Sequence, residues 1–270
     1  MYAFIHIPKT AGTTLRFLFR SAFSANHCDA RLPLHRRKKN IKWLHARDMR
    51  IIKLAYPKLM SISGHNVCSF TDLDQSIDDI QYFTVLRDPV QRFISSFNHK
   101  YRRDIDALTL ETLEKFIQNP ANHNVQTRWL CGEENADVAI QAAKEQLGFV
   151  GLTEQFDESL VLLKQWINSP SFNINYVTRR KAPKKAALPY LEDARIYQMI
   201  LDVNQEDIKL YNYVKDELFP QQVADYGDSF NEDLANFHQQ QQSFEGADEP
   251  RWSVAKRNLI YKILVHLPFV

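Results

Sequence analysis

Apolar and polar residues follow two recurring patterns along the chain, one with the spacing of a strand and one with the spacing of a helix. Residues 2–7 form a short apolar run that ends at Pro8, and a turn of mostly small residues follows. Residues 13–23 then carry apolar side chains three and four positions apart, which predicts an amphipathic helix. The beginning of the chain is therefore predicted to form a strand, a tight turn and a helix.

A second unit of the same kind begins near residue 82. Residues 82–86 are β-branched or aromatic except for Leu86, which predicts a strand. Arg87-Asp88-Pro89 ends this run, and residues 90–101 continue with helical spacing. Proline is favoured in the first turn of a helix, so this segment also predicts a strand, a turn and a helix.

The rest of the pattern alternates in the same way, apart from a loop expected at 25–42 and a loop or helical turn expected at 70–79. Strands alternating with helices imply a parallel sheet that is covered on both faces. We therefore expect an α/β fold with three layers, in which helices flank a central parallel sheet. Further strands are predicted at 59–63, 149–152 and 175–177, and further helices at 43–56, 110–118, 136–147, 156–166 and most of 192–219, with Pro220 as a stop.

Length and composition favour one large domain. The chain has 270 residues, 44% of them hydrophobic, which is enough to bury a substantial core. We expect a single domain over 1–270, with a core over about 1–220 and an extension over 221–270 that packs on it. The three cysteines are far apart, so neither a zinc site nor a disulfide framework is suggested.

No segment has the character of a membrane anchor. No run reaches the ~18 apolar residues of a membrane-spanning helix, and no signal peptide is recognisable. The apolar stretch 259–270 is predicted to be a docking helix, with contact to a membrane surface as the weaker alternative. These features predict a cytoplasmic protein, or one that lacks its anchor.

Positive charge is concentrated locally although the net charge is only +2. Residues 31–50 hold eight Lys or Arg and one acidic residue, and residues 179–185 hold five more cations. Such local fields attract polyanions and phosphorylated ligands. An exposed, solvated basic surface explains both stretches equally well.

The turn after the first strand has the chemistry of an anion site. A helix N-terminus presents unpaired N–H groups and a partial positive charge, and here the turn adds Lys9 and the hydroxyls of Thr10, Thr13 and Thr14. It is not a Walker A loop, because Lys9 precedes Gly12.

The string from His6 to Leu15 closely resembles the 5′-phosphosulfate-binding loop of the carbohydrate sulfotransferases, the family that includes the heparan sulfate 2-O-sulfotransferases. The resemblance implies a P-loop-like fold and 3′-phosphoadenosine-5′-phosphosulfate (PAPS) as co-substrate, with adenosine 3′,5′-bisphosphate as product and no metal. It also implies that Lys9 acts in catalysis, by neutralising the leaving oxygen. The residues implied to bind the co-substrate here are Lys9, Thr10, Ala11, Gly12, Thr13 and Thr14.

The segment 87–97 resembles the 3′-phosphate-binding segment of the same family. Arg87 follows a strand, where α/β folds place ligand contacts, and a guanidinium is a natural bidentate partner of phosphate. The resemblance implies that Arg87 and Ser95 hold the 3′-phosphate. Asp88 and Arg92 are instead expected to form a helix cap or an i,i+4 ion pair.

His65 is the predicted catalytic base. Sulfuryl transfer needs a group that accepts the proton of the attacking hydroxyl. Gly64-His65 follows a predicted strand, and it matches the Gly-His element that carries the base in enzymes resembling the 2-O-sulfotransferases. His6 is the main rival, but its predicted strand is central and a buried role is favoured. Glu154 is the carboxylate alternative.

Two further segments are expected near the ligands. Residues 124–132 also resemble part of the family, and Gln126 and Arg128, like His65, are predicted to face the acceptor; a surface ion pair explains Arg128 equally well. The basic stretch 178–185 lies where the family has a loop that closes over the nucleotide. It resembles that loop only loosely, and it places Arg180 and Lys181 among the predicted co-substrate contacts.

The sequence thus predicts a sulfotransferase that moves a sulfuryl group from PAPS to a hydroxyl, with a glycan or glycan-like molecule as acceptor. One alternative is a P-loop-like small-molecule kinase, which would need Mg²⁺ and a carboxylate after a strand. The other is a non-catalytic protein that binds polyanions. No nucleic-acid-binding module is recognisable, and neither the acceptor nor the oligomeric state follows from the sequence.

Overall fold

A five-stranded parallel sheet lies at the centre of the described part of the chain. The computed structural model describes residues 1–32, 42–177, 188–246 and 251–266. The strand order is β2-β3-β1-β4-β5, and all neighbouring pairs are parallel. This confirms the predicted α/β class. The strands are β1 (Tyr2–Ile5), β2 (His27–Asp29), β3 (Ser61–Gly64), β4 (Gln81–Leu86) and β5 (Leu147–Leu152).

The central strand β1 is buried from Ala3 to Ile5, as expected for a parallel sheet covered on both faces. Tyr2 pairs with Ser61 of β3 on one side and with Gln81 of β4 on the other. Stacked aromatic rings fill the space next to β1, with ring centroids 5.0 Å apart for Phe4 and Phe83.

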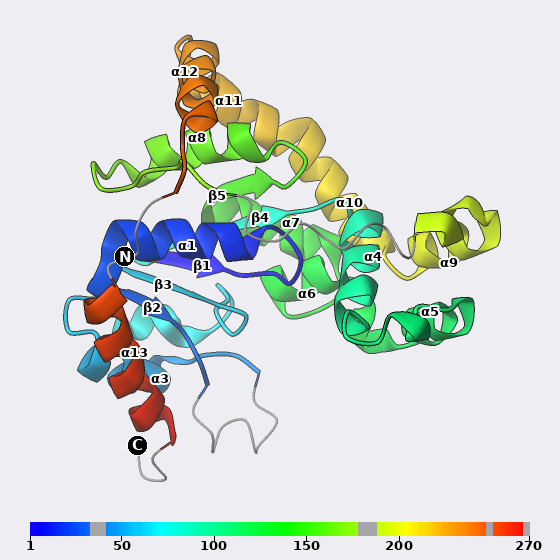
Figure 1. Ribbon diagram of the computed structural model, residues 1–270, viewed down its shortest axis with the longest axis horizontal. Coiled ribbons are helices and arrows are strands. Elements are labelled where there is room, and N and C mark those ends of the chain that lie inside the picture. The colour runs from blue at the N-terminus through cyan, green and yellow to red at the C-terminus, as the bar shows by residue number, and fades with distance from the viewer. Residues whose placement is uncertain (33–41, 178–187, 247–250, 267–270) are drawn as a thin grey trace.

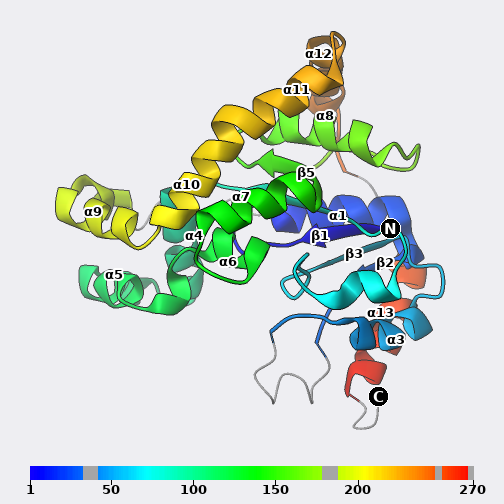
Figure 2. The ribbon, with the colours of Figure 1, turned by 180° about the vertical axis from the view of Figure 1, so that it is seen from behind.

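Helices cover both faces of the sheet, with α1 (Gly12–Phe23) on one face and α7 (Ala136–Glu145) on the other (Figures 1 and 2). The α8 helix (Phe156–Ile167) packs on β5. The other helices are α3 (Ala46–Ala55), α4 (Pro89–Lys100), α5 (Leu110–Ile117), α6 (Val125–Cys131), α9 (Ala194–Asp202), α10 (Gln205–Tyr213), α11 (Phe219–Tyr226), α12 (Phe230–Gln242) and α13 (Arg251–His266).

The connections after β1 and β4 diverge. The chain leaves β1 through α1 toward β2 at one edge of the sheet, and it leaves β4 toward β5 at the other edge. Ligands of open α/β sheets bind in the crevice that such diverging loops create at the carboxyl ends of the strands. The predicted site residues after β1 and β4 follow these strand ends, where the topology predicts such a crevice.

Helices α4, α5 and α9 form a separate apolar cluster to one side of the sheet (Figure 1). Phe93 and Phe97 of α4 pack edge-on against Phe116 of α5. This second cluster supports α4, which carries most of the predicted phosphate-binding segment and begins two positions after Arg87.

Three local predictions were wrong. Residues 27–29 form strand β2 inside the predicted loop. Residues 175–177 do not form a strand, because the Tyr176 backbone pairs with the side chain of Gln241. Pro220 does not end a helix, since a π-helical turn (Val214–Leu218) precedes it and places it in the first turn of α11, where a missing N–H is tolerated.

The last described helix, α13, packs on α3 at the β2 edge of the sheet (Figure 1). The Tyr261 side chain is buried, and its hydroxyl contacts the N–H of Arg31 at 3.0 Å and the carbonyl of Arg31 at 2.8 Å. Arg257 donates to the Ala55 carbonyl at 2.7 Å. Among the described helices, none combines the length and apolar character needed to cross a bilayer.

Candidate active site

The turn between β1 and α1 is held in an unusual backbone conformation. Lys9 and Ala11 have φ angles of 74° and 58°, a left-handed region that costs energy for residues other than glycine. Left-handed residues next to a helical start direct successive N–H groups into one concavity, which favours an anion. The first N–H groups of α1, at Gly12 and Thr13, lack intrahelical partners by the geometry of a helix start.

The three threonines of the turn differ in their surroundings. Thr10 is fully buried, and its hydroxyl donates to the Ile7 carbonyl at 3.1 Å, so it braces the turn. Thr13 is exposed and Thr14 is half-buried. The hydroxyl that we expected Thr10 to offer to a phosphate is therefore used inside the protein.

Gly12 is required by the position of the His6 ring. A Cβ atom at residue 12 would lie 2.0 Å from two atoms of that ring. His6 is only 6% exposed, and burial, helped by the nearby His65 and Arg16, lowers its pKa to about 2. His6 is therefore neutral, and its ring packs between the turn and His65, as its expected buried role requires.

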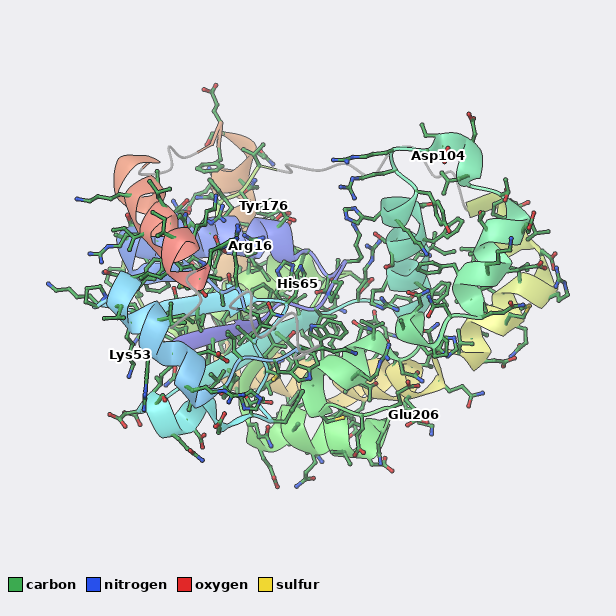
Figure 3. The ribbon with its side chains drawn as sticks, turned by 90° about the horizontal axis from the view of Figure 1, so that it is seen from below. Arg16, Lys53, His65, Asp104, Tyr176 and Glu206 are labelled. Carbon is green, nitrogen blue, oxygen red and sulfur yellow. The ribbon has the colours of Figure 1, made fainter. Side chains whose placement is uncertain are left out.

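His65 lies directly after β3 with one ring nitrogen committed. Its ring lies on the His6 ring with centroids 4.0 Å apart, and its Nδ1 is 2.7 Å from the His6 carbonyl oxygen. A carbonyl can only accept, so Nδ1 carries the proton and Nε2 carries the lone pair. The residue is exposed, and Figure 3 places it near Arg16 of α1. Desolvation lowers the pKa of His65, so it is neutral at neutral pH, as a base must be.

Arg87 contacts the turn directly. Its Nη1 donates to the Lys9 carbonyl at 3.2 Å. Burial lowers the pKa of Arg87, but nearby Glu154 and Asp88 oppose this effect, and a guanidinium stays cationic in proteins. The two predicted phosphate-binding segments therefore meet at one point of the crevice.

We had expected Gln126 to face the acceptor, but the structure places it elsewhere. It is fully buried, and its side chain accepts from the Arg87 N–H and donates to the Arg87 carbonyl, both at 2.8 Å. The backbone of α6 is held in turn by Asp207, which accepts from the N–H groups of Gln126 and Thr127 at 3.1 and 2.8 Å. Gln126 thus supports Arg87 from behind.

Arg128 and Ser95 are less closely tied to the crevice. Arg128 donates to the Ala121 carbonyl at 2.8 Å and lies 3.8 Å from Glu134, which agrees with the ion-pair alternative. Ser95 lies half-exposed in the second turn of α4. Arg180 and Lys181 lie outside the described residues.

The helix-start prediction for α4 holds only in part. Asp88 caps α4 by accepting from the Gln91 N–H at 2.8 Å. Arg92 does not pair with Asp88; it is buried 3.8 Å from Asp207. Glu154, the alternative base, accepts from the Asp88 N–H at 3.0 Å and from the Tyr211 hydroxyl at 3.1 Å, contacts that suit a supporting role.

A hollow of about 370 Å³ lies between α6 and α7. It is lined mostly by apolar side chains, including Leu130, Val138 and Ala142, and it contains none of the predicted site residues. Its lining has no Lys or Arg, so it lacks the charge that a phosphate requires.

Comparison with known proteins decides the family. The family model described as the sulfotransferase family matches residues 2–214. The chain belongs to the sulfotransferase family. The matched range includes the Lys9 turn, His65 and Arg87, so all three lie within the part that this sulfotransferase shares with its family.

Its relatives include several heparan-sulfate 6-O-sulfotransferases. Heparan-sulfate 6-O-sulfotransferase 2 of Gallus gallus is 26% identical over 80% of this chain and 66% of its own length. The Mus musculus protein of the same name is 24% identical over 90% of this chain and 48% of its own length. Heparan-sulfate 6-O-sulfotransferase 1-B of Danio rerio is 24% identical over 81% of this chain and 65% of its own length.

The chain therefore spans about half to two thirds of the length of the curated relatives it matches. These relatives are 6-O enzymes, whereas the sequence motifs suggested 2-O enzymes. They give no support to the predicted cytoplasmic location or to the kinase and polyanion-binder alternatives. Among the described residues, no group of three or more His, Cys, Asp or Glu side chains is arranged to hold a metal.

Proposed function

We propose that this protein transfers a sulfuryl group from PAPS to a hydroxyl of a glycan, with a heparan-sulfate-like chain as the acceptor. The observation that carries the proposal is the contact between Arg87 and the Lys9 carbonyl, because it brings the two phosphate-binding segments to one crevice. A nucleotide with phosphates at both ends of its ribose needs two such anion sites close together.

The residues present fit this co-substrate. The left-handed turn and the N-terminus of α1 supply N–H groups for the 5′-phosphate. The Arg87 guanidinium supplies the bidentate geometry suited to the 3′-phosphate, and Ser95 on α4 is the second proposed contact. PAPS, when bound there, supplies the sulfuryl group.

His65 has the geometry of a general base in this scheme. Its Nε2 takes the proton of the attacking hydroxyl, while the Nδ1 bond to the His6 carbonyl holds the ring and its tautomer. The new bond joins the acceptor oxygen to sulfur, and the bond from sulfur to the bridging oxygen breaks. Lys9 neutralises the charge on that oxygen; a well-placed donor of this kind contributes about 2.7–4 kcal/mol.

The glycan acceptor is supported by the names of the relatives and by local charge. Arg31, Lys42, Arg47 and Arg50 are exposed near the β2 edge of the sheet, where they can attract an anionic polysaccharide. The 6-O position is part of the proposal because the relatives share that name.

Ligand binding tests the proposal before any acceptor is known. Adenosine 3′,5′-bisphosphate at 100 times its Kd should add about 2.7 kcal/mol of stability, measured as a rise in Tm, and AMP or Mg-ATP at equal concentration should add less. Arg87→Met should abolish most of this rise, and Arg103→Met, at an exposed arginine, is the matched control.

Transfer of labelled sulfate from PAPS to desulfated heparan sulfate completes the test. Product sulfated at the 6-O position is expected. A protein that prefers Mg-ATP, or that binds bisphosphate equally well without the Arg87 side chain, would contradict the proposal.

A further inference from the structure

The short helix α6 contacts both halves of the proposed site through the backbone. The Gln126 side chain makes two hydrogen bonds to the backbone of Arg87, and the Trp129 indole N–H donates to the His65 carbonyl at 3.1 Å. Residues three apart on a helix lie on the same side, so one face of α6 holds both segments.

The first residues of α6 are held by a buried carboxylate of helix α10. Asp207 of α10 is fully buried, and it accepts hydrogen bonds from the Gln126 N–H, the Thr127 N–H and the Thr127 hydroxyl. The backbone turns left-handed at Gly132, directly after α6, with a φ of 86°. Both ends of α6 are therefore defined, and the helix can act as a rigid spacer.

We propose that Gln126 and Trp129 are positioning residues that set the separation between the His65 base and the Arg87 guanidinium. This inference rests on the function proposed above. Neither residue needs to touch a reacting atom, because each acts through the backbone of its neighbour. A displacement of about 1 Å in a catalytic group can cost about 100-fold in rate, so this spacing matters.

The chain contains a matched control for Gln126. Gln222 of α11 makes the same two-way contact with the backbone of Val150 in β5, at 3.1 and 2.9 Å. Gln126→Leu and Gln222→Leu each remove one such pair of hydrogen bonds, and both should lower Tm. Only Gln126→Leu should also weaken binding of adenosine 3′,5′-bisphosphate, by about tenfold, measured by calorimetry.

Trp129→Phe keeps an aromatic ring but removes the N–H donor together with part of the indole. We expect kcat for sulfate transfer to fall by about tenfold, while the Kd for the bisphosphate stays unchanged. Trp166→Phe, at a half-buried tryptophan that packs on the core beside Phe83, is the control and should leave kcat unchanged. If Gln126 and Trp129 had a purely structural role, Gln126→Leu and Trp129→Phe would instead both lower Tm and the active fraction. The first would then not act mainly on Kd, nor the second mainly on kcat.

The outcomes separate this inference from the proposed function. If wild-type protein binds the bisphosphate and transfers sulfate, but Gln126→Leu binds it as tightly as Gln222→Leu does, the positioning role is wrong. Full kcat in Trp129→Phe would overturn it as well. Wild-type protein that neither binds the bisphosphate nor transfers sulfate would overturn the proposed function itself.

Discussion

Two histidines on neighbouring strands show how surroundings separate a candidate base from a structural residue. His27 of β2 is 3% exposed, and both its ring nitrogens are engaged, Nδ1 with Ser61 at 2.8 Å and Nε2 with Ser63 at 3.2 Å. His65, just after β3, is exposed and has only Nδ1 engaged. Desolvation lowers the pKa of both, through full burial of His27 and through partial burial of the His65 ring, so both are neutral, but only His65 has a nitrogen available for a proton.

Arg16 connects the surroundings of His27 with those of His65. The Ser63 hydroxyl that accepts from His27 donates to Asp29, and Arg16 donates to the same carboxylate oxygen at 2.8 Å. The charge of Arg16 also reaches His65, where it helps to lower the pKa. A low pKa alone therefore does not identify a base; an available nitrogen beside the phosphate-binding turn does.

The largest expected effect is a loss of turnover when His65 is replaced. His65→Ala should reduce turnover by about 10²–10⁴-fold, the usual contribution of a general base, because no group then accepts the hydroxyl proton. Binding of adenosine 3′,5′-bisphosphate, followed by thermal shift, should stay close to that of wild type. An equal loss of binding and turnover would make His65 a structural residue and would remove the contrast with His27.

A smaller effect, on stability and not on turnover, is expected when the buried His27 is replaced. His27→Ala leaves the Ser61 hydroxyl without its buried partner and removes one of the two partners of Ser63, which should cost about 2–4 kcal/mol of unfolding free energy. Denaturant unfolding measures this loss. The folded fraction should keep its turnover per molecule; loss of turnover at unchanged stability would show that His27 takes part in the chemistry.

The smallest expected effect concerns the arginine between the two regions. Turnover requires neutral His65, so it should rise with pH through the lowered pKa of His65 and then level off. Arg16→Gln removes a positive charge that lowers this pKa, so the acid limb of the pH profile should move to higher pH, by less than about one unit.

Arg20→Gln is the matched control for this shift. Arg20 pairs with the same Asp29, but it does not contribute to the lowered pKa of His65. Its pH profile should match that of wild type. Equal shifts in the two variants would mean that the effect passes through Asp29 and not through the charge of Arg16.

Local patterns predicted the elements that carry the site. The strand before the Lys9 turn, the strand before Arg87 and the cap at Asp88 each depend on neighbouring residues, and each was found. Strand β2 was missed because three residues inside a polar stretch have no detectable period. The prediction that Pro220 ends a helix was wrong because the π-helical turn before it has no sequence signal.

Contacts between distant segments could not be predicted in this way. Gln126 lies 39 positions from Arg87, and Asp207 lies 81 positions from Gln126, so no spacing rule connects them. Buried polar groups need partners, but the sequence does not say which ones. A buried Asp207 and a glutamine that binds a strand end become evident only when the sheet brings them together.

The packing of the His6 ring against Gly12 has a consequence for how this sequence can change over generations. A methyl group at position 12 would need the volume that the imidazole already fills. As long as residue 6 is a histidine, only glycine fits at position 12. A smaller side chain at position 6 would leave room for a side chain at position 12. The two positions should therefore vary together among descendants of this gene, as a pair linked by shape.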